Sequence, residues 1–296
     1  MRSAEALANI LKNALDSILE AAGGASFEDI RLDDGVKARI LADPLFTIEI
    51  VSEDAFCVKA NPTDICIAIL RDYYHGFLRA ERQWLSANSL AADSDHIAWT
   101  VVSAYYCAFF CAIEILRILG RFPLSLSQAE ATLFARRAVG AHKQDFLSKG
   151  HRNFVGSPSG DFSEITFKAS GDRPHQFAWQ QLSSTAFSYF PKKTGDWVEL
   201  GKFKNICIGK KGWENPSDIR NRWNYRDSTY FGALGRKSSQ PFLKLLQDRS
   251  SASAWIKDRP KVTSEVDSIA SLAALGQFLF GAVKEAYQIG FPDQNN

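Results

Sequence analysis

The chain has 296 residues, of which 46% are hydrophobic and 23% charged, and its formal net charge is +2. This balance is typical of a globular protein with a sizeable core and excludes a disordered or fibrous chain. The charge is uneven, because residues 1–120 carry 10 basic against 17 acidic residues, whereas residues 121–237 carry 19 against 10. The basic middle also holds aromatic residues. This suits a polyanion with stacking bases and, equally, a basic surface above buried tryptophans.

The five cysteines lack the spacing of a disulfide framework or of a zinc site. Cys107 and Cys111 share one helix face inside an apolar run, so we expect them to pack in the core. We therefore predict no metal and no cofactor. The N-terminal residues lack the basic start and apolar run of a signal peptide, which favours a cytoplasmic protein.

The first predicted elements form an N-terminal region, residues 1–62. Residues 4–22 place apolar side chains at helical spacing, and the pair Gly23–Gly24 ends this helix. Two short apolar runs around Ser52-Glu-Asp54 then predict a β-hairpin near residues 46–59.

Two long helices follow, from Pro62 to about Asn88 and from Asp93 to Gly120. A short polar link joins them, so they should pack antiparallel. The second helix is apolar enough to suggest a membrane span, but it contains Glu114 and Arg117. These charges are costly in lipid and are tolerated as an i,i+3 pair in a bundle. We predict a central core helix and no membrane contact.

The remaining elements complete a mainly α fold. Residues 127–149 are predicted to be helical, and helical spacing returns from about Thr263 to Ile289. Residues 150–215 are rich in glycine, serine, proline and aromatic residues and predict an irregular α/β insertion. Inside it we note short apolar runs at 162–167 and 203–208 and helical spacing at 174–189.

The sequence therefore predicts an up-and-down helical bundle built from two segments of the chain. Residues 63–149 and 216–296 form the bundle, the N-terminal region precedes it, and the insertion at about 150–215 interrupts it.

The segment from Asn215 to Asp227 reads N-P-S-D-I-R-N-R-W-N-Y-R-D. Ser217 or Asp218 is expected to cap a helix, and Arg220 and Asn224 would then share one face at i,i+4. Arginines near a helix start suit phosphate, so an anionic ligand such as RNA is one hypothesis. The alternative, which residue types alone favour, is a helix whose arginines are merely solvated. No glycine-rich phosphate loop is found, since Ile208-Gly-Lys-Lys-Gly212, just before this segment, has the composition but lacks the P-loop spacing.

Three pieces of the sequence carry a resemblance to a known family. They are Ser103-Ala-Tyr-Tyr-Cys-Ala-Phe-Phe-Cys-Ala112, Ala141-His-Lys143 and Ile219-Arg-Asn-Arg-Trp-Asn-Tyr225. In this order they resemble the HEPN superfamily, over about residues 64–149 and 216–289.

The resemblance implies an up-and-down helical bundle that often forms a homodimer. It also implies a prokaryotic toxin–antitoxin or phage-defence setting, in which a nucleotidyltransferase antitoxin is a possible partner protein. Some HEPN proteins are metal-independent ribonucleases that act on RNA, and others are noncatalytic partners.

The residues that the resemblance assigns to a site lie around Arg220. Active HEPN ribonucleases carry Arg, a polar residue and, a few positions later, His. Arg220 and Asn221 match the start of this signature, but Tyr225 stands at the His position and is followed by Arg226. Tyrosine has an ordinary pKa of about 10 and is a poor base at neutral pH, so we expect Tyr225 to orient a phosphate or a 2′-hydroxyl.

A second Arg–His pair is formed by Arg137 and His142, with Lys143 beside them. A five-residue offset does not share one helix face, unless Gly140 interrupts the helix. His142 could also approach Arg220 across the bundle and rebuild the constellation from two segments. The candidates are then Arg220, Asn221, Tyr225 and His142 for catalysis, and Arg222, Arg226, Lys143 and Arg137 for RNA binding.

Three functional hypotheses stay open at this point. The chain is a HEPN-like metal-independent endoribonuclease, a noncatalytic HEPN scaffold that binds a partner protein or RNA, or a helical adaptor that resembles HEPN only in core composition. The missing His favours the second hypothesis, and the uneven charge favours neither of the first two.

Overall fold

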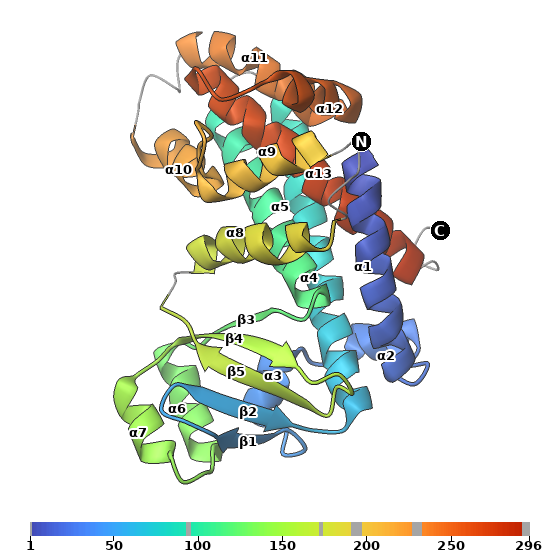
Figure 1. The fold of residues 1–296 in the computed structure, drawn as a ribbon, viewed down its shortest axis with the longest axis vertical. Helices are drawn as coiled ribbons and strands as arrows, with labels where there is room; N and C mark the ends of the chain where they lie inside the picture. The colour runs from blue at the N-terminus through green and yellow to red at the C-terminus, as the bar shows by residue number, and fades with distance from the viewer. Residues whose placement is uncertain (1, 93–95, 172–173, 191–196, 227–232, 292–296) are drawn as a thin grey trace. The chain divides into compact units, whose positions relative to one another are not determined.

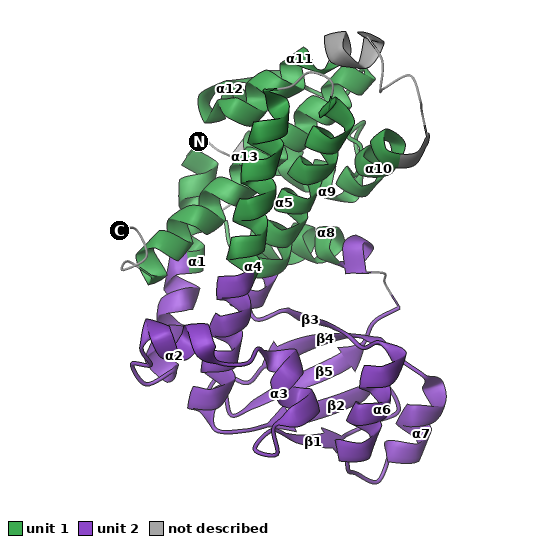
Figure 2. Cartoon of the chain, turned by 180° about the vertical axis from the view of Figure 1, so that it is seen from behind, with its two compact units in different colours: residues 1–11, 76–115, 178–295 green, residues 12–75, 116–177, 296 purple. Residues whose placement is uncertain are grey.

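The computed structural model describes residues 2–92, 96–171, 174–190, 197–226 and 233–291, which form mainly helices and one antiparallel sheet (Figure 1). The chain divides into two compact units (Figure 2). The first, called the helical unit, comprises residues 1–11, 76–115 and 178–295. The second, called the sheet unit, comprises residues 12–75 and 116–177. These boundaries differ from the predicted ones, because residues 116–149 and the strands of the predicted insertion belong to one unit.

The sheet unit contains five antiparallel strands in the order β1-β2-β5-β4-β3. The strands are β1 (Thr47–Ile50), β2 (Ala55–Lys59), β3 (Phe122–Ser125), β4 (Asn153–Pro158) and β5 (Glu164–Ala169). The predicted hairpin near residues 46–59 is confirmed as β1–β2. It is not isolated, however, because β2 pairs along its whole length with β5 of the predicted insertion.

One face of the sheet is buried under the helices α6 (Gln128–Arg137) and α7 (Lys143–Lys149), and α3 (Val36–Ala42) lies beside α6 (Figure 2). Phe56 on β2 lies at the centre of this core. Its ring centroid is 4.9 Å from that of Phe167 on β5, 4.7 Å from Phe134 on α6 and 5.9 Å from Phe146 on α7. Edge-to-face and offset ring pairs of this kind stabilise a core beyond the area that they bury.

The predicted helical region 127–149 consists of two helices, because the chain leaves helical geometry between α6 and α7, at the glycine that could interrupt it. Gly140 has a φ of +123°, which a residue with a side chain rarely adopts. Val139, just before it, exchanges backbone hydrogen bonds with β1, at 2.7 Å to the Ile50 N–H and at 3.0 Å to the Ile48 carbonyl. The interruption thus covers the outer edge of β1, which would otherwise expose unpaired backbone groups.

The helical unit is built around α13 (Glu265–Gly290), whose side chains are buried on nearly every side. Its neighbours are α9 (Trp197–Ile208), α10 (Pro216–Asn221), α11 (Ala233–Gln247) and α12 (Arg249–Asp258). The rings of Phe203 on α9 and Phe278 on α13 stack with centroids 4.4 Å apart. The apolar run at 203–208 is therefore part of a helix.

The long helices α4 (Pro62–Ala91) and α5 (Ile97–Ile118) pack antiparallel, as predicted. A Cβ placed on Gly76 would meet the carboxyl group of Glu114, and the Arg79 guanidinium lies 5.7 Å from the ring centroid of Phe110. The expected i,i+3 pair of Glu114 and Arg117 stays a prediction, and Arg117 also reaches Asp72 on α4, with Nε and Oδ2 3.8 Å apart.

The remaining described helices are shorter or lie near the unit boundaries. They are α1 (Arg2–Ala21), α2 (Phe27–Leu32), α8 (Pro174–Thr185), the 3₁₀ turn η2 (Ala186–Ser188) and the π-helix η3 (Arg222–Arg226). α5 and α13 are long and apolar enough to cross a membrane, but 78% and 89% of their apolar windows are buried within the protein. Such burial is typical of the core helices of a folded domain.

The Gly140 turn gives a test of the fold. In Gly140→Ala, the new Cβ would lie 2.5 Å from the Ile50 carbonyl oxygen, in a backbone conformation that alanine avoids. We expect the free energy of unfolding to fall by about 2–4 kcal/mol, measured by urea unfolding followed by circular dichroism. Gly150→Ala is the control, because Gly150 also has a positive φ but no atom within 4 Å of the added Cβ. Equal losses of stability in the two variants would contradict the close approach of Gly140 to β1.

Candidate functional site

The helix α10 begins with a cap that differs from the predicted one. The Asn215 side chain accepts a hydrogen bond from the Ser217 N–H at 2.9 Å and donates to the Cys207 carbonyl at 2.5 Å. Pro216 occupies the first helical position, where a missing N–H costs nothing. The prediction that Ser217 or Asp218 caps the helix is therefore wrong, and the cap also ties α10 to the end of α9.

The Ser217 hydroxyl does not cap the helix and instead contacts a buried tyrosine. It lies 3.2 Å from the hydroxyl of Tyr105 on α5. Burial raises the pKa of Tyr105, while the hydrogen bond with Ser217 acts in the opposite direction. Tyr105 is thus a neutral phenol at physiological pH, and it fixes the position of α10 against α5.

Arg220 lies above the two aromatic rings at this point of α5. Its guanidinium carbon is 5.1 Å from the ring centroid of Tyr105 and 5.7 Å from that of Tyr106. The side chain is half-buried, and its Nε is buried without a hydrogen-bond acceptor among the described residues. No described carboxylate forms an ion pair with it, although Asp218 is in the first turn of the same helix. The site therefore holds a stacked cation without a described counter-anion.

Arg222, two residues further on, has the opposite environment. It forms a close ion pair with Glu214, and its Nη1 lies 3.2 Å from Oε1 of Glu265. Two carboxylates thus balance its charge, and the contacts hold the start of η3 against the start of α13. Arg222, predicted to bind RNA, has its donors engaged within the protein.

The rest of the predicted segment lies in a π-helix. Asn221 is the last residue of α10, and Asn224 is in η3, where the wider turn changes the i,i+4 register expected with Arg220. Trp223 is buried and anchors this turn. The backbones of Tyr225 and Arg226 belong to η3, but their side chains lie outside the described residues. Their predicted roles stay predictions.

His142 and Lys143 belong to the sheet unit, whereas Arg220 belongs to the helical unit. His142 is exposed at the residue before α7 and makes no capping hydrogen bond with its side chain, and Lys143 is half-buried. The structure places each of them within its own unit, and the pairing of His142 with Arg220 stays a prediction.

Arg137 has a structural role that the sequence did not indicate. Its guanidinium donates to four backbone carbonyls, those of Arg39 at 3.1 Å, Ile40 at 2.5 Å, Phe46 at 2.8 Å and, more closely, Asp43. These carbonyls lie at the end of α3 and in the connection to β1, where helical hydrogen bonding ends; that of Arg39 also accepts from the Asp43 N–H at 2.9 Å. The expected RNA contact and the Arg137–His142 constellation are replaced here by a clamp on the protein's own backbone.

The cysteines and acidic residues offer no alternative centre. The described residues contain no group of three His, Cys, Asp or Glu side chains that could hold a metal ion. All five cysteines are buried and unbridged, and burial raises the pKa of Cys57 to about 11 and that of Cys66 to about 12. Such thiols are protonated at neutral pH and therefore weakly nucleophilic.

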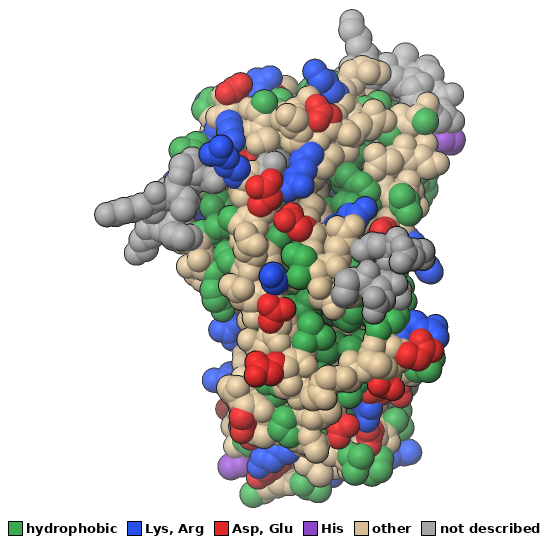
Figure 3. All heavy atoms as spheres, turned by 90° about the vertical axis from the view of Figure 1, so that its right-hand side faces the viewer, with side chains coloured by type: hydrophobic (Ala, Val, Ile, Leu, Met, Phe, Trp, Pro, Cys, Tyr) green, Lys and Arg blue, Asp and Glu red, His purple; other side chains and the backbone are tan. Residues whose placement is uncertain are grey.

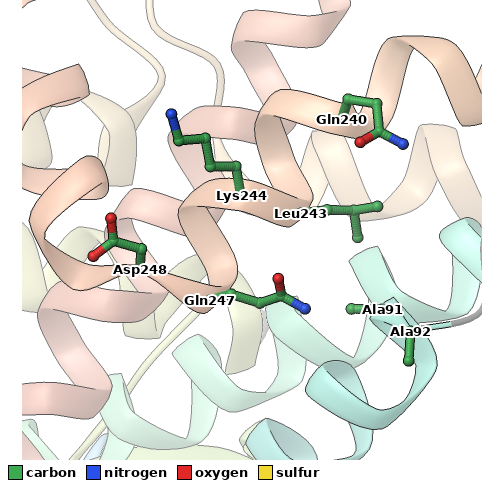
Figure 4. A pocket seen from close by; sticks show the side chains of 7 residues that line it. All are labelled: Ala91, Ala92, Gln240, Leu243, Lys244, Gln247 and Asp248. Carbon is green, nitrogen blue, oxygen red and sulfur yellow. The ribbon is translucent and has the colours of Figure 1, made fainter.

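A pocket of about 480 Å³ lies between the end of α4 and α11, away from the predicted residues (Figure 4). Leu243 and Gln247 extend toward Ala91 and Ala92, and Lys244 and Asp248 lie at its rim. Asp248 accepts hydrogen bonds from the N–H groups of Ser250 and Ser251 as the cap of α12. The carboxylate of Asp248 is thus engaged within the protein, while Gln240, Lys244 and Gln247 provide the other polar groups that line the pocket.

Charged side chains are mixed on the face that Figure 3 shows, where basic and acidic groups alternate. A broad cationic surface is not visible there, so the case for an anion site depends on Arg220 itself. The tyrosines beneath it were missed as site residues. The signal that could have found them is the Tyr105–Tyr106 pair, because a phenol hydroxyl in an apolar helix usually has a polar partner nearby.

No protein-family model, curated protein or solved structure matches this chain.

The clamp of Arg137 can be tested directly. Arg137→Ala should lower the free energy of unfolding by about 2–4 kcal/mol, because four carbonyls lose a charged donor. Arg137→Lys should recover only part of this loss, since an ammonium group cannot span the same fork of acceptors. Arg136→Ala removes a neighbouring exposed arginine and should stay within about 0.5 kcal/mol of the parent in urea unfolding. If Arg136→Ala and Arg137→Ala lower the free energy of unfolding equally, the clamp does not have the stabilising role described.

Proposed function

We propose that this chain is a HEPN-like protein that acts on RNA, and that Arg220 binds a phosphate group. The observation that carries the proposal is the Arg220 guanidinium, held on the faces of Tyr105 and Tyr106 with no described carboxylate partner. An aromatic face attracts a cation through its quadrupole without neutralising its charge. The outer donors of the guanidinium thus stay available for an anion.

Phosphate fits such a donor better than other common anions. A guanidinium presents parallel N–H groups that match two oxygens of a phosphate, and these charge-assisted hydrogen bonds are strong. Half-burial strengthens them further, because the local dielectric constant is lower than that of water. The capped and stacked setting also fixes Arg220 in advance, which reduces the entropy lost on binding.

We favour binding without cleavage as the role of the helical unit. Metal-independent cleavage needs a group that moves a proton at neutral pH, usually histidine. Among the five histidines, His96 alone falls within the residue ranges of the helical unit, and no described contact joins it to Arg220. The noncatalytic scaffold is therefore the first candidate.

The endoribonuclease is the second candidate, and a specific observation supports it. The segment that carries Arg220 and Asn221 continues directly into the π-helix η3, and π-helical turns occur frequently at functional sites. In this version Arg220 stabilises the charge of the phosphate, Tyr225 orients it, and His142 or another group moves the proton.

The HEPN resemblance also supplies the proposed setting. It suggests a cytoplasmic homodimer in a prokaryotic defence or toxin–antitoxin system, with a partner protein such as a nucleotidyltransferase antitoxin. A nucleotidyltransferase gene beside this one would support the two-component version.

RNA binding is the first test. Fluorescence polarisation with a labelled single-stranded RNA should show Kd raised about 10-fold or more in Arg220→Ala, because a charge-assisted bidentate contact is lost. Arg82→Ala removes an exposed charge from α4 of the same unit and should change Kd by less than about 3-fold. Equal Kd values for Arg220→Ala and the parent would overturn the assignment of Arg220.

Cleavage is tested separately, with total RNA incubated in EDTA. The scaffold version predicts no cleavage by the parent protein. If the parent cleaves, the nuclease version requires that Arg220→Ala and His142→Ala lose about 10²-fold or more in rate. Cleavage that both variants retain in full would exclude these residues from the chemistry.

A further inference from the structure

The connection between α9 and α10 has an unusual backbone at a lysine pair. Gly209, Lys211 and Gly212 have φ values of +64°, +55° and +79°, all in the left-handed region. Glycine adopts this region freely, but a lysine there is uncommon and is kept only when its surroundings impose it. We call residues 209–212 the lysine loop.

The lysine loop is anchored from both sides. The N–H of Lys210 donates to the Asn205 carbonyl at 3.0 Å, and the N–H of Trp213 donates to the Lys210 carbonyl at 3.1 Å. The Gly212 carbonyl accepts from the Val262 N–H at 3.0 Å. Trp213, which ends the loop, is buried with its ring centroid 6.3 Å from that of Trp255. The left-handed turn is therefore fixed by the protein around it.

Two backbone donors remain unused in this fixed turn. The N–H groups of Lys211 and Gly212 donate to no acceptor among the described residues. Successive N–H groups in a turn of this kind form a concave nest that binds anions. A glycine at 212 also lets Lys261 lie against the loop, since a Cβ there would be 3.1 Å from Cβ of Lys261.

Three ammonium groups accompany these donors. Lys210, Lys211 and Lys261 are exposed, and none forms an ion pair among the described residues. Three lysines of the sheet unit differ in this respect, because Lys37 pairs with Glu130, Lys59 with Glu49 and Lys149 with Glu53. The charge at the lysine loop is not balanced by ion pairs of this kind.

We propose that the lysine loop, with Lys261, is a phosphate-binding site that holds the backbone of RNA. The ligand chemistry is a phosphate oxygen placed against the Lys211 and Gly212 N–H groups and surrounded by three ammonium groups. This proposal rests on the proposed function in one respect, namely that the phosphate belongs to RNA. The loop lies against the cap of α10, since a Cβ on Gly209 would be 3.4 Å from Asn215. It therefore adds a second phosphate contact on the connection that leads to Arg220.

The salt dependence of binding tests this site in the full-length protein. The triple variant Lys210→Gln, Lys211→Gln, Lys261→Gln should bind a single-stranded RNA more weakly. Its plot of log Kd against log salt should be shallower by about 2, because three phosphate contacts are lost. The control is Lys204→Gln, Lys244→Gln, Lys284→Gln, which removes the same charge from exposed positions of the helical unit and should leave the slope within about 0.5.

A further variant separates the nest from the net charge. Lys211→Gly removes one ammonium group but favours the left-handed turn, so its slope should fall by about 0.7 and its urea midpoint should not decrease. Gly212→Ala keeps all three charges but crowds Lys261, and its RNA affinity should fall with the slope unchanged. Equal effects of the two triple variants on slope and affinity overturn the site.

The source of the phosphate is decided by two more measurements. Titration with inorganic phosphate and with a nucleoside triphosphate, followed by calorimetry, should give weak binding that the triple variant loses. Binding of a nucleotide more tightly than of RNA would overturn the assignment to RNA, as would binding to anionic vesicles in preference to RNA.

If the parent binds RNA and the lysine-loop triple variant binds it equally, this inference fails while the proposed function stands. If the lysine-loop triple variant weakens RNA binding and Arg220→Ala does not, this inference stands and the assignment of Arg220 fails.

Discussion

The helical unit depends on covering α13 on every side. This helix is buried on nearly every side between Asp267 and Val283, so it is stable only where other helices exclude water from these faces. α9, α10, α11 and α12 provide this cover. α10 has six residues and could not persist alone, because a helix so short does not repay its nucleation cost. Its contact with α13, the Asn215 cap and the Tyr105–Ser217 hydrogen bond hold it in place. The burial of α13 therefore fixes the position of α10, and with it the position of Arg220.

Arg220 and Arg222 show how two neighbouring arginines acquire different chemistry. Two carboxylates from separate segments surround Arg222, so an approaching phosphate would meet both negative charges. The aromatic faces beneath Arg220 hold its cation in a low-dielectric position and add no competing anion. The wider turn of η3 begins between them and directs the two side chains to different surroundings. The same residue type thus stabilises the fold at 222 and leaves a charge open to a ligand at 220.

Local patterns predicted most of the helices and the hairpin, because capping residues and apolar periodicity act over a few neighbouring positions. The sequence patterns did not predict the features that depend on contacts between segments far apart in the chain. β5 joins β2 across more than a hundred residues, and no local pattern of β2 indicates this partner. The break at Gly140 follows from Val139 pairing with β1, and the fate of Arg137 from carbonyls in the α3–β1 connection. At the site, the arginine-rich segment was recognised as a helix. Its cap, its π turn and the glutamates on Arg222 depend on neighbours that only the folded chain brings together.

Folding brings part of the basic stretch of the sequence together with acidic residues from the N-terminal part. Residues 121–237 are basic as a stretch, but the sheet unit takes the part up to residue 177 and combines it with residues of the acidic N-terminal part. There Lys149 meets Glu53, and Lys37, from that acidic part, meets Glu130. A lysine with a carboxylate partner would have to lose that contact before it could bind phosphate, which offsets much of the gain. The lysines of the lysine loop and Arg220 form no ion pair among the described residues, and they lie along one connection of the helical unit. A polyanion would be recognised there by fixed N–H groups and a stacked guanidinium, and this geometry is more selective than a broadly basic surface.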